Sequence, residues 1–191
     1  MSAPGKGLEA YLDALHELDA KSGRSAIIHV PTPGTITGRT AGAGRSFRAG
    51  GKVWPDFAGG LRVQLVEGGA SVPVLVAGEA KECGEAIRFP WGRVKPHQME
   101  RLRWTAAAGG IAWVYVRPPR GGDVLIPVGP DGPPGAGRRE LAGSCSWAEA
   151  EAESWIVPPG RSWLDAAIGP SGLLRWRAYL EAGWRGVALR P

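Results

Sequence analysis

The chain has 191 residues, a length typical of one compact domain that buries its own core. Hydrophobic residues make up 43% and charged residues 21%, which excludes a mainly disordered chain. The formal net charge of +5 and the excess of arginine over lysine suit a phosphate-rich partner, and they fit a GC-rich genome equally well. We expect Cys83 and Cys145 to be free thiols, and the absence of a signal peptide or membrane-spanning stretch predicts a cytoplasmic protein.

Hydrophobic periodicity predicts an order of helices and strands that forms an α/β fold with one mixed sheet flanked by helices. Pro96 marks a helix start, and Ser146 and Ser162 resemble helix N-caps. We expect a single domain over residues 1–168 and a helical extension over 169–191. The predicted helices cover residues 6–21, 96–107 and 173–182, and the predicted strands cover residues 26–30, 61–67, 72–83, 111–116 and 124–128.

Residues 34–52 differ in character from the rest of the chain. Glycine dominates the segment, and all of its charge is positive, from Arg39, Arg45, Arg48 and Lys52. The segment is too polar for the core and too basic for an ordinary turn. A long loop without clear structure is uncommon in a compact domain unless it is functional. We therefore predict an irregular, basic segment with a functional role; a solvated loop is the alternative.

Three charged residues form the clearest candidate for catalysis. Glu79 and Lys81 lie two apart at the end of an apolar strand, so their side chains point to the same face. Asp56 lies at the start of the preceding hairpin arm, where strand pairing brings it beside Glu79. Two adjacent carboxylates need a cation, and oxygen ligands suit Mg²⁺, with Mn²⁺ as a substitute. The set predicts metal-dependent phosphodiester hydrolysis, provided that all three side chains reach solvent and DNA.

As a string, this Pro-Asp and Glu-x-Lys pattern is weak, and a salt bridge on a hairpin is the alternative. A longer series of motifs, covering roughly residues 5–128, resembles the RecU-type Holliday junction resolvases of the PD-(D/E)xK nuclease superfamily. The motifs that carry the resemblance are Gly7-Leu8-Glu9, Ile27-Ile28-His29, Pro31-Thr32-Pro33, Asp56-Phe57-Ala58-Gly59, Glu79-Ala80-Lys81-Glu82, Phe89-Pro90, His97-Gln98 and Gly109-Gly110-Ile111-Ala112.

The resemblance implies a restriction-endonuclease-like mixed sheet and a homodimer that makes paired, symmetric nicks in four-way DNA junctions with Mg²⁺ or Mn²⁺. It implies that residues 34–52 form a protruding stalk, whose Arg39, Arg45, Arg48 and Lys52 contact phosphates. Pro55 stands where the family usually has Thr, and the stalk is shorter. Because of the short stalk, the sequence does not support a recombinase as a partner. A bacterial or a phage origin fits equally.

Further candidates surround this set. Asp56, Glu79 and the Ala80 carbonyl are the predicted metal ligands, and Lys81 is predicted to act on the attacking water. Glu9 is either a third acidic ligand or a solvated helix residue. Gln98 matches the family's active-site position, and His97 and Lys95 are candidate DNA contacts. Trp54 and Trp91 are expected to pack rather than to stack on bases.

Two other functions stay open. The first is a different restriction-like nuclease that acts on ordinary duplex or flap DNA in repair or replication. The second is a DNA-binding recombination accessory protein without catalysis. A comparison of cleavage of four-way junctions and linear duplex separates the three functions.

Overall fold

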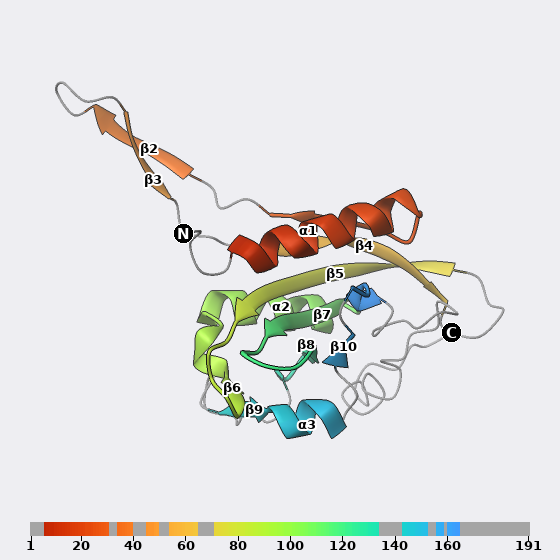
Figure 1. The fold of residues 1–191 in the computed structure, drawn as a ribbon. Helices are drawn as coiled ribbons and strands as arrows, with labels where there is room; N and C mark the ends of the chain where they lie inside the picture. Colours follow the sequence, from red (N-terminus) through yellow and green to blue (C-terminus); the bar gives the residue numbers. More distant parts are fainter. Residues whose placement is uncertain are drawn as a thin grey trace.

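A computed structural model of the chain describes residues 6–30, 34–39, 45–49, 54–64, 71–133, 143–152, 156–158 and 160–164. Its centre is a six-stranded mixed sheet with strand order β1-β4-β5-β7-β8-β10 (Figure 1). The helices are α1 (Lys6–Lys21), η1 (Trp91–Arg93, a 3-10 helix), α2 (Pro96–Ala107) and α3 (Trp147–Ala152), and the strands are β1 (Ser25–His29), β2 (Gly34–Arg39), β3 (Arg45–Ala49), β4 (Phe57–Gln64), β5 (Ser71–Glu82), β6 (Arg88–Pro90), β7 (Ile111–Arg117), β8 (Asp123–Pro127), β9 (Ser144–Ser146) and β10 (Ile156–Val157).

The sheet is mixed because one of its strand pairs is parallel. β5 and β7 run parallel and are joined through α2, whereas the other neighbouring pairs are antiparallel. This is the α/β architecture predicted from the sequence, with one mixed sheet flanked by helices. The predicted strand over residues 72–83 is confirmed as a central strand, since β5 lies between β4 and β7.

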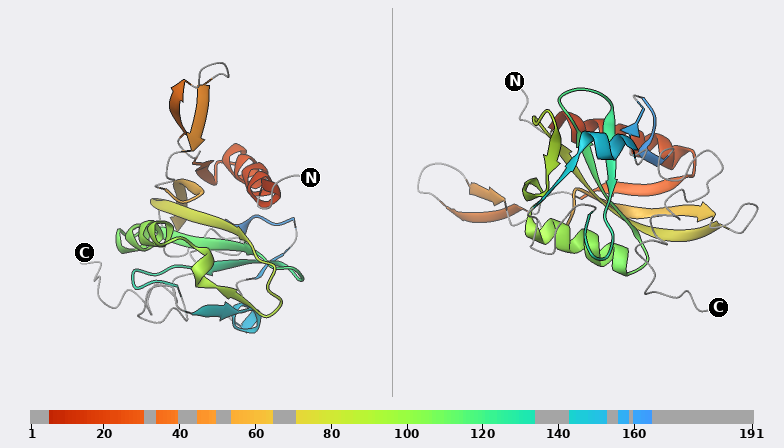
Figure 2. Two further views of the ribbon diagram at one scale, coloured as in Figure 1. Left: turned by 90° about the vertical axis from the view of Figure 1, so that its left-hand side faces the viewer. Right: turned by 90° about the horizontal axis from the view of Figure 1, so that it is seen from below.

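Helices α1 and α2 cover opposite faces of the sheet (Figure 2). On the α1 side, Leu8 and Leu12 pack with Phe57 of β4 and Trp113 of β7. On the α2 side, the predicted apolar face of Met99, Leu102 and Ala106 packs against Ala77, Ala112 and Val114 of the sheet. Because neighbouring residues of β5 enter different cores, Val76 and Ala80 face α1 while Ala77 and Cys83 face α2.

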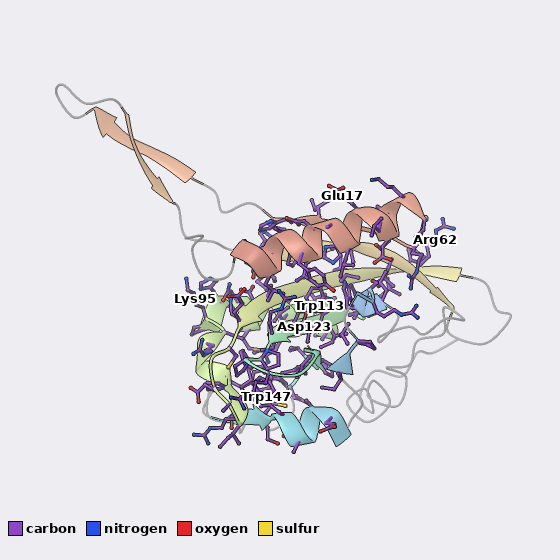
Figure 3. The ribbon with its side chains drawn as sticks, viewed as in Figure 1. Glu17, Arg62, Lys95, Trp113, Asp123 and Trp147 are labelled. Carbon is purple, nitrogen blue, oxygen red and sulfur yellow. The ribbon has the colours of Figure 1, made fainter. Side chains whose placement is uncertain are left out.

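Gly78 of β5 lies so close to Trp113 that no other residue fits there. A Cβ atom at this position would lie 2.1 Å from the Trp113 ring. Figure 3 shows Trp113 in the interior of the molecule, below α1. The close approach of the Trp113 ring to the backbone fixes the position of Gly78, the residue before Glu79.

The segment 34–52 is more ordered than the sequence predicts. Within it, β2 and β3 form an antiparallel hairpin with an irregularity between Ile36 and Arg39. The hairpin projects from the end of the molecule at which β5 ends (Figures 1 and 2). The prediction of an irregular loop is therefore wrong for residues 34–39 and 45–49. These residues form strands because their backbones pair with each other, which the glycine-rich composition does not indicate.

One smaller difference concerns residues 84–95, for which the sequence predicts a loop. These residues contain β6 and η1, and β6 pairs with β9, the strand that includes Ser146. Ser146 does cap α3, since its Oγ accepts a hydrogen bond from the Glu149 backbone at 3.1 Å. The predicted helix over residues 173–182 and the extension over 169–191 lie outside the described residues. Both cysteines are free and buried, as predicted, and none of the helices in the described ranges is long and apolar enough to cross a membrane.

A polar cluster ties the short segment 160–164 to α1. The Trp163 indole donates a hydrogen bond to Nε2 of His16 at 2.9 Å, and the Ser162 hydroxyl donates to Asp19. His16 is buried against the edge of Phe57. Burial lowers the pKa of His16 to about 4, so the imidazole is neutral and its Nε2 can accept the hydrogen bond from the indole N–H.

We expect this histidine to make folding sensitive to acid. The pKa of His16 is 6.5 when the chain is unfolded and about 4 when it is folded, so the unfolded chain binds the extra proton between these values. The free energy of unfolding should fall by about 2–3 kcal/mol through His16 alone between pH 7.5 and 4.5. Urea unfolding of the wild type and of His16→Gln at both pH values measures the contribution of His16. The carboxylates titrate in both chains, so the difference between the two pH dependences belongs to His16. Equal pH dependence in the two chains would contradict the assignment.

Candidate active site

Asp56 and Glu79 meet because β4 and β5 pair in a fixed register. Phe57 lies opposite Gly78, so the residue before Phe57 reaches the residue after Gly78. The Ala80 backbone donates a hydrogen bond to Oδ2 of Asp56 at 2.9 Å, and the Asp56 backbone donates to Oε2 of Glu79 at 3.2 Å. The two carboxylates are thus held at adjacent strand positions, as the sequence spacing predicts.

Lys81 and Gln98 approach the other oxygen of Glu79. The Lys81 ammonium and the Gln98 side-chain amide both donate to Oε1 of Glu79. Gln98 lies in the first turn of α2, and its own Oε1 accepts from the Lys95 backbone at 3.1 Å, which orients the amide toward Glu79. The structure therefore brings together four of the predicted site residues from three elements: Asp56, Glu79, Lys81 and Gln98.

The site is less open than the sequence led us to expect. Asp56 is 4% exposed and Glu79 is 0% exposed, while the Lys81 side chain retains 22%. The requirement that all three side chains reach solvent is not met, because Lys81 and Gln98 cover the Glu79 carboxylate. Burial raises the pKa of Glu79 to about 8; the charge of Lys81 opposes this rise and that of Asp56 adds to it.

The donor set fits a hard divalent cation. Two carboxylates lie side by side, and the Ala80 carbonyl points to the β4 side, because the N–H and C=O groups of one strand residue point to the same edge and this N–H binds Asp56. Among the described residues, no three His, Cys, Asp or Glu side chains gather into a metal site. A site of two carboxylates and one carbonyl, completed by water and phosphate oxygens, is typical of Mg²⁺. Such an ion would take over from Lys81 the neutralisation of Glu79.

Glu9 lies with a different partner. Its Oε2 atom is 3.6 Å from Nε2 of His29, and Oδ2 of Asp13 is 3.3 Å from Nδ1 of the same imidazole. Within the described part of the chain, Glu9 thus pairs with His29 between α1 and β1 rather than joining Asp56 and Glu79. Its role as a third metal ligand stays a prediction.

The predicted DNA contacts fall on two features. Arg39, Arg45 and Arg48 belong to the β2–β3 hairpin, whose register pairs Arg39 with Arg45, and Lys52 lies outside the described residues. Lys95 and His97 are exposed at the start of α2. Figure 3 places the Lys95 side chain at the end of the molecule from which the hairpin projects.

The packing prediction is confirmed for Trp91 and wrong for Trp54. Trp91 has no exposed surface, and its ring meets the edge of Phe89. Trp54 is 43% exposed, with the Arg101 guanidinium 5.3 Å from its ring centroid. Sequence reasoning missed Arg101; the available signal was its position one helical turn after Gln98.

Comparisons with known proteins find likenesses among solved structures alone. No protein-family model and no curated protein matches the chain. Among solved structures, the chain is similar to Hjc from Archaeoglobus fulgidus, a Holliday junction resolvase from an archaeal hyperthermophile. The two share 23% sequence identity with a TM-score of 0.41, over 78% of this chain and 93% of that one.

Proposed function

We propose that the chain is a metal-dependent endonuclease that resolves four-way DNA junctions by paired, symmetric nicks. The observation that carries the proposal is the hydrogen-bonded set of Asp56, Glu79 and Lys81 at neighbouring strand positions. A structural salt bridge explains Lys81 and Glu79 alone, but it does not account for a second carboxylate buried beside them. The motif series that resembles the RecU-type resolvases supports the same reading.

Each residue then has a chemical role. Asp56, Glu79 and the Ala80 carbonyl would hold Mg²⁺ or Mn²⁺, and the bound ion would supply Lewis-acid activation of the phosphate and of the attacking water. Lys81 would orient or deprotonate the attacking water, and its charged form would stabilise the charge that develops on the phosphate. Before the metal binds, Gln98 orients Glu79 through the hydrogen bond between its amide and Oε1. Hydrolysis of the phosphodiester leaves one phosphate end and one hydroxyl end at each nick.

Two symmetric cuts require two sites, which a homodimer with a two-fold axis supplies. In this proposal the β2–β3 hairpin of each subunit enters the junction, and the arginines at Arg39, Arg45 and Arg48 contact its phosphates. Lys95 and His97 add contacts beside the cut strand. The protein acts in the cytoplasm, and the net charge of +5 favours its association with DNA.

A second function has one observation in its favour. The complete burial of Glu79 under Lys81 and Gln98 is what a structural ion pair would produce. A DNA-binding accessory protein without catalysis would fit such a pair. In the nuclease, Lys81 and Gln98 must release Glu79 when the metal and the substrate bind.

Cleavage assays separate these functions. The substrates are a mobile four-way junction and a linear duplex built from the same arms, each with Mg²⁺, with Mn²⁺ and with EDTA. We expect paired nicks in the junction that depend on the metal, at a rate at least tenfold above that on the duplex. Equal rates on both substrates would identify a general nuclease, and junction binding without nicks in either metal would identify an accessory protein.

A further inference from the structure

Trp54 is an exposed aromatic residue directly beside the candidate active site. It lies two residues before Asp56, and 43% of its surface is accessible although Pro55 and Asp56 next to it are buried. A tryptophan left exposed at such a position costs the folded chain apolar burial that it could otherwise gain. Its exposure therefore suggests a contact that is made outside this chain.

Helix α2 supplies charge and a second aromatic ring to the same surface. The Arg101 guanidinium lies over the Trp54 ring, and Gln98, one turn earlier on α2, donates to Glu79. Trp104, one turn after Arg101, is 53% exposed. His97, Arg101 and Trp104 are spaced four and three residues apart, so they follow one stripe of the helix. We call Trp54, Arg101 and Trp104 the aromatic–arginine surface.

The charges around this surface favour a nucleic acid over a protein partner. On α2 and its cap, the described side chains that carry charge and are at least partly exposed are Lys95, Arg101 and Arg103, against one acidic residue, Glu100. Cationic and aromatic side chains together are typical of sites that bind single-stranded nucleic acid, where rings stack on bases and cations follow the backbone. The charge on Arg101 also holds the Trp54 ring in position by a cation–π contact.

We infer that the aromatic–arginine surface stacks an unpaired base of the DNA, with Trp54 as the stacking ring and Arg101 as its support and phosphate contact. The inference rests on the proposed function for its placement, since the base belongs to the nucleotide beside the phosphate at Asp56 and Glu79. Bases at a strand exchange point are more easily unstacked than bases within a duplex, which would let this surface distinguish branched from linear DNA.

Binding to single-stranded DNA tests the inference without relying on cleavage. The probes are a single-stranded oligonucleotide that carries 2-aminopurine and a four-way junction that carries 2-aminopurine at the point of strand exchange. Both are measured in EDTA. Stacking against a ring quenches 2-aminopurine fluorescence. We expect Trp54→Ala to weaken single-strand affinity by roughly 5- to 150-fold, the range for one base–aromatic stack, and to abolish the quenching. Trp54→Phe should restore most of both.

Leu18→Ala is the matched control, since Leu18 is an exposed apolar residue of α1 on the opposite side of the sheet, 62% accessible. Unchanged affinity and quenching in Trp54→Ala would overturn the inference and leave the nuclease proposal standing. Quenching that depends on Trp54 in a chain that cuts no junction would support the base-binding surface and reject the nuclease. Loss of self-association in Trp54→Ala, measured by sedimentation, with unchanged DNA binding would assign the surface to a protein contact and overturn the inference.

Discussion

Replacing Asp56 with asparagine is expected to lower the rate of junction cleavage by on the order of 10³-fold while leaving junction affinity within a few-fold. Asparagine has nearly the shape of aspartate, and its carbonyl oxygen can still accept the hydrogen bond from the Ala80 backbone. What it removes is one of the two negative charges that the metal needs. The rate is measured under single-turnover conditions with Mg²⁺, and the affinity is measured in EDTA.

The control for this substitution is Asp131→Asn, which makes the same replacement at an exposed aspartate in the loop after β8. It should cut at the wild-type rate. Equal thermal unfolding of Asp56→Asn and the wild type shows that the site, rather than the fold, has changed. Cleavage by Asp56→Asn at the wild-type rate would remove Asp56 from the site and with it the proposed metal ligand set.

The convergence of Asp56 with Glu79 was predictable because it depends on local geometry. Alternation along a strand places Glu79 and Lys81 on one face whatever the rest of the fold does. A hairpin of adjacent strands then needs only its register to bring Asp56 to Glu79. Both are short-range properties that the sequence states directly.

The burial of the site was not predictable, because it depends on contacts between distant segments. The Glu79 carboxylate is covered by Gln98, which arrives 19 residues later through the crossover helix α2. The side-chain oxygen of Gln98 accepts a hydrogen bond from the Lys95 backbone N–H, and this bond directs the Gln98 amide toward Glu79. The sequence identified Gln98 as a candidate, but not that its amide would lie on Glu79.

The β2–β3 hairpin and Trp54 were misjudged for related reasons. Glycine and arginine are poor strand formers by composition, so the pairing of residues 34–39 with 45–49 is visible only in the backbone. For Trp54, the general rule that large aromatic side chains supply core area gave the wrong environment. At this position the neighbouring Pro55 and Asp56 are buried instead.

The second large effect is expected from Lys81, in combination with its partner. Lys81→Met should lower cleavage by about 10²- to 10⁴-fold, because it removes the group that orients or deprotonates the water. It also leaves the buried Glu79 without the cation that favours its ionised form, so the carboxyl either stays charged and unpaired or takes up a proton, and the free energy of unfolding should fall by up to about 3 kcal/mol. Lys21→Met, at an exposed lysine of α1, is the matched control and should change neither quantity measurably.

The double variant Glu79→Gln with Lys81→Met separates catalysis from stability. Removing both members of a buried ion pair leaves no uncompensated charge, so the double variant should regain most of the stability that Lys81→Met loses. If Glu79 and Lys81 only stabilise the fold, cleavage should return together with stability in the double variant. In a nuclease, cleavage should stay as low as in the single variant although the protein is stable, since neither the metal ligand nor the lysine is present. Recovery of cleavage together with stability in urea unfolding would show that Glu79 and Lys81 only hold the strands together.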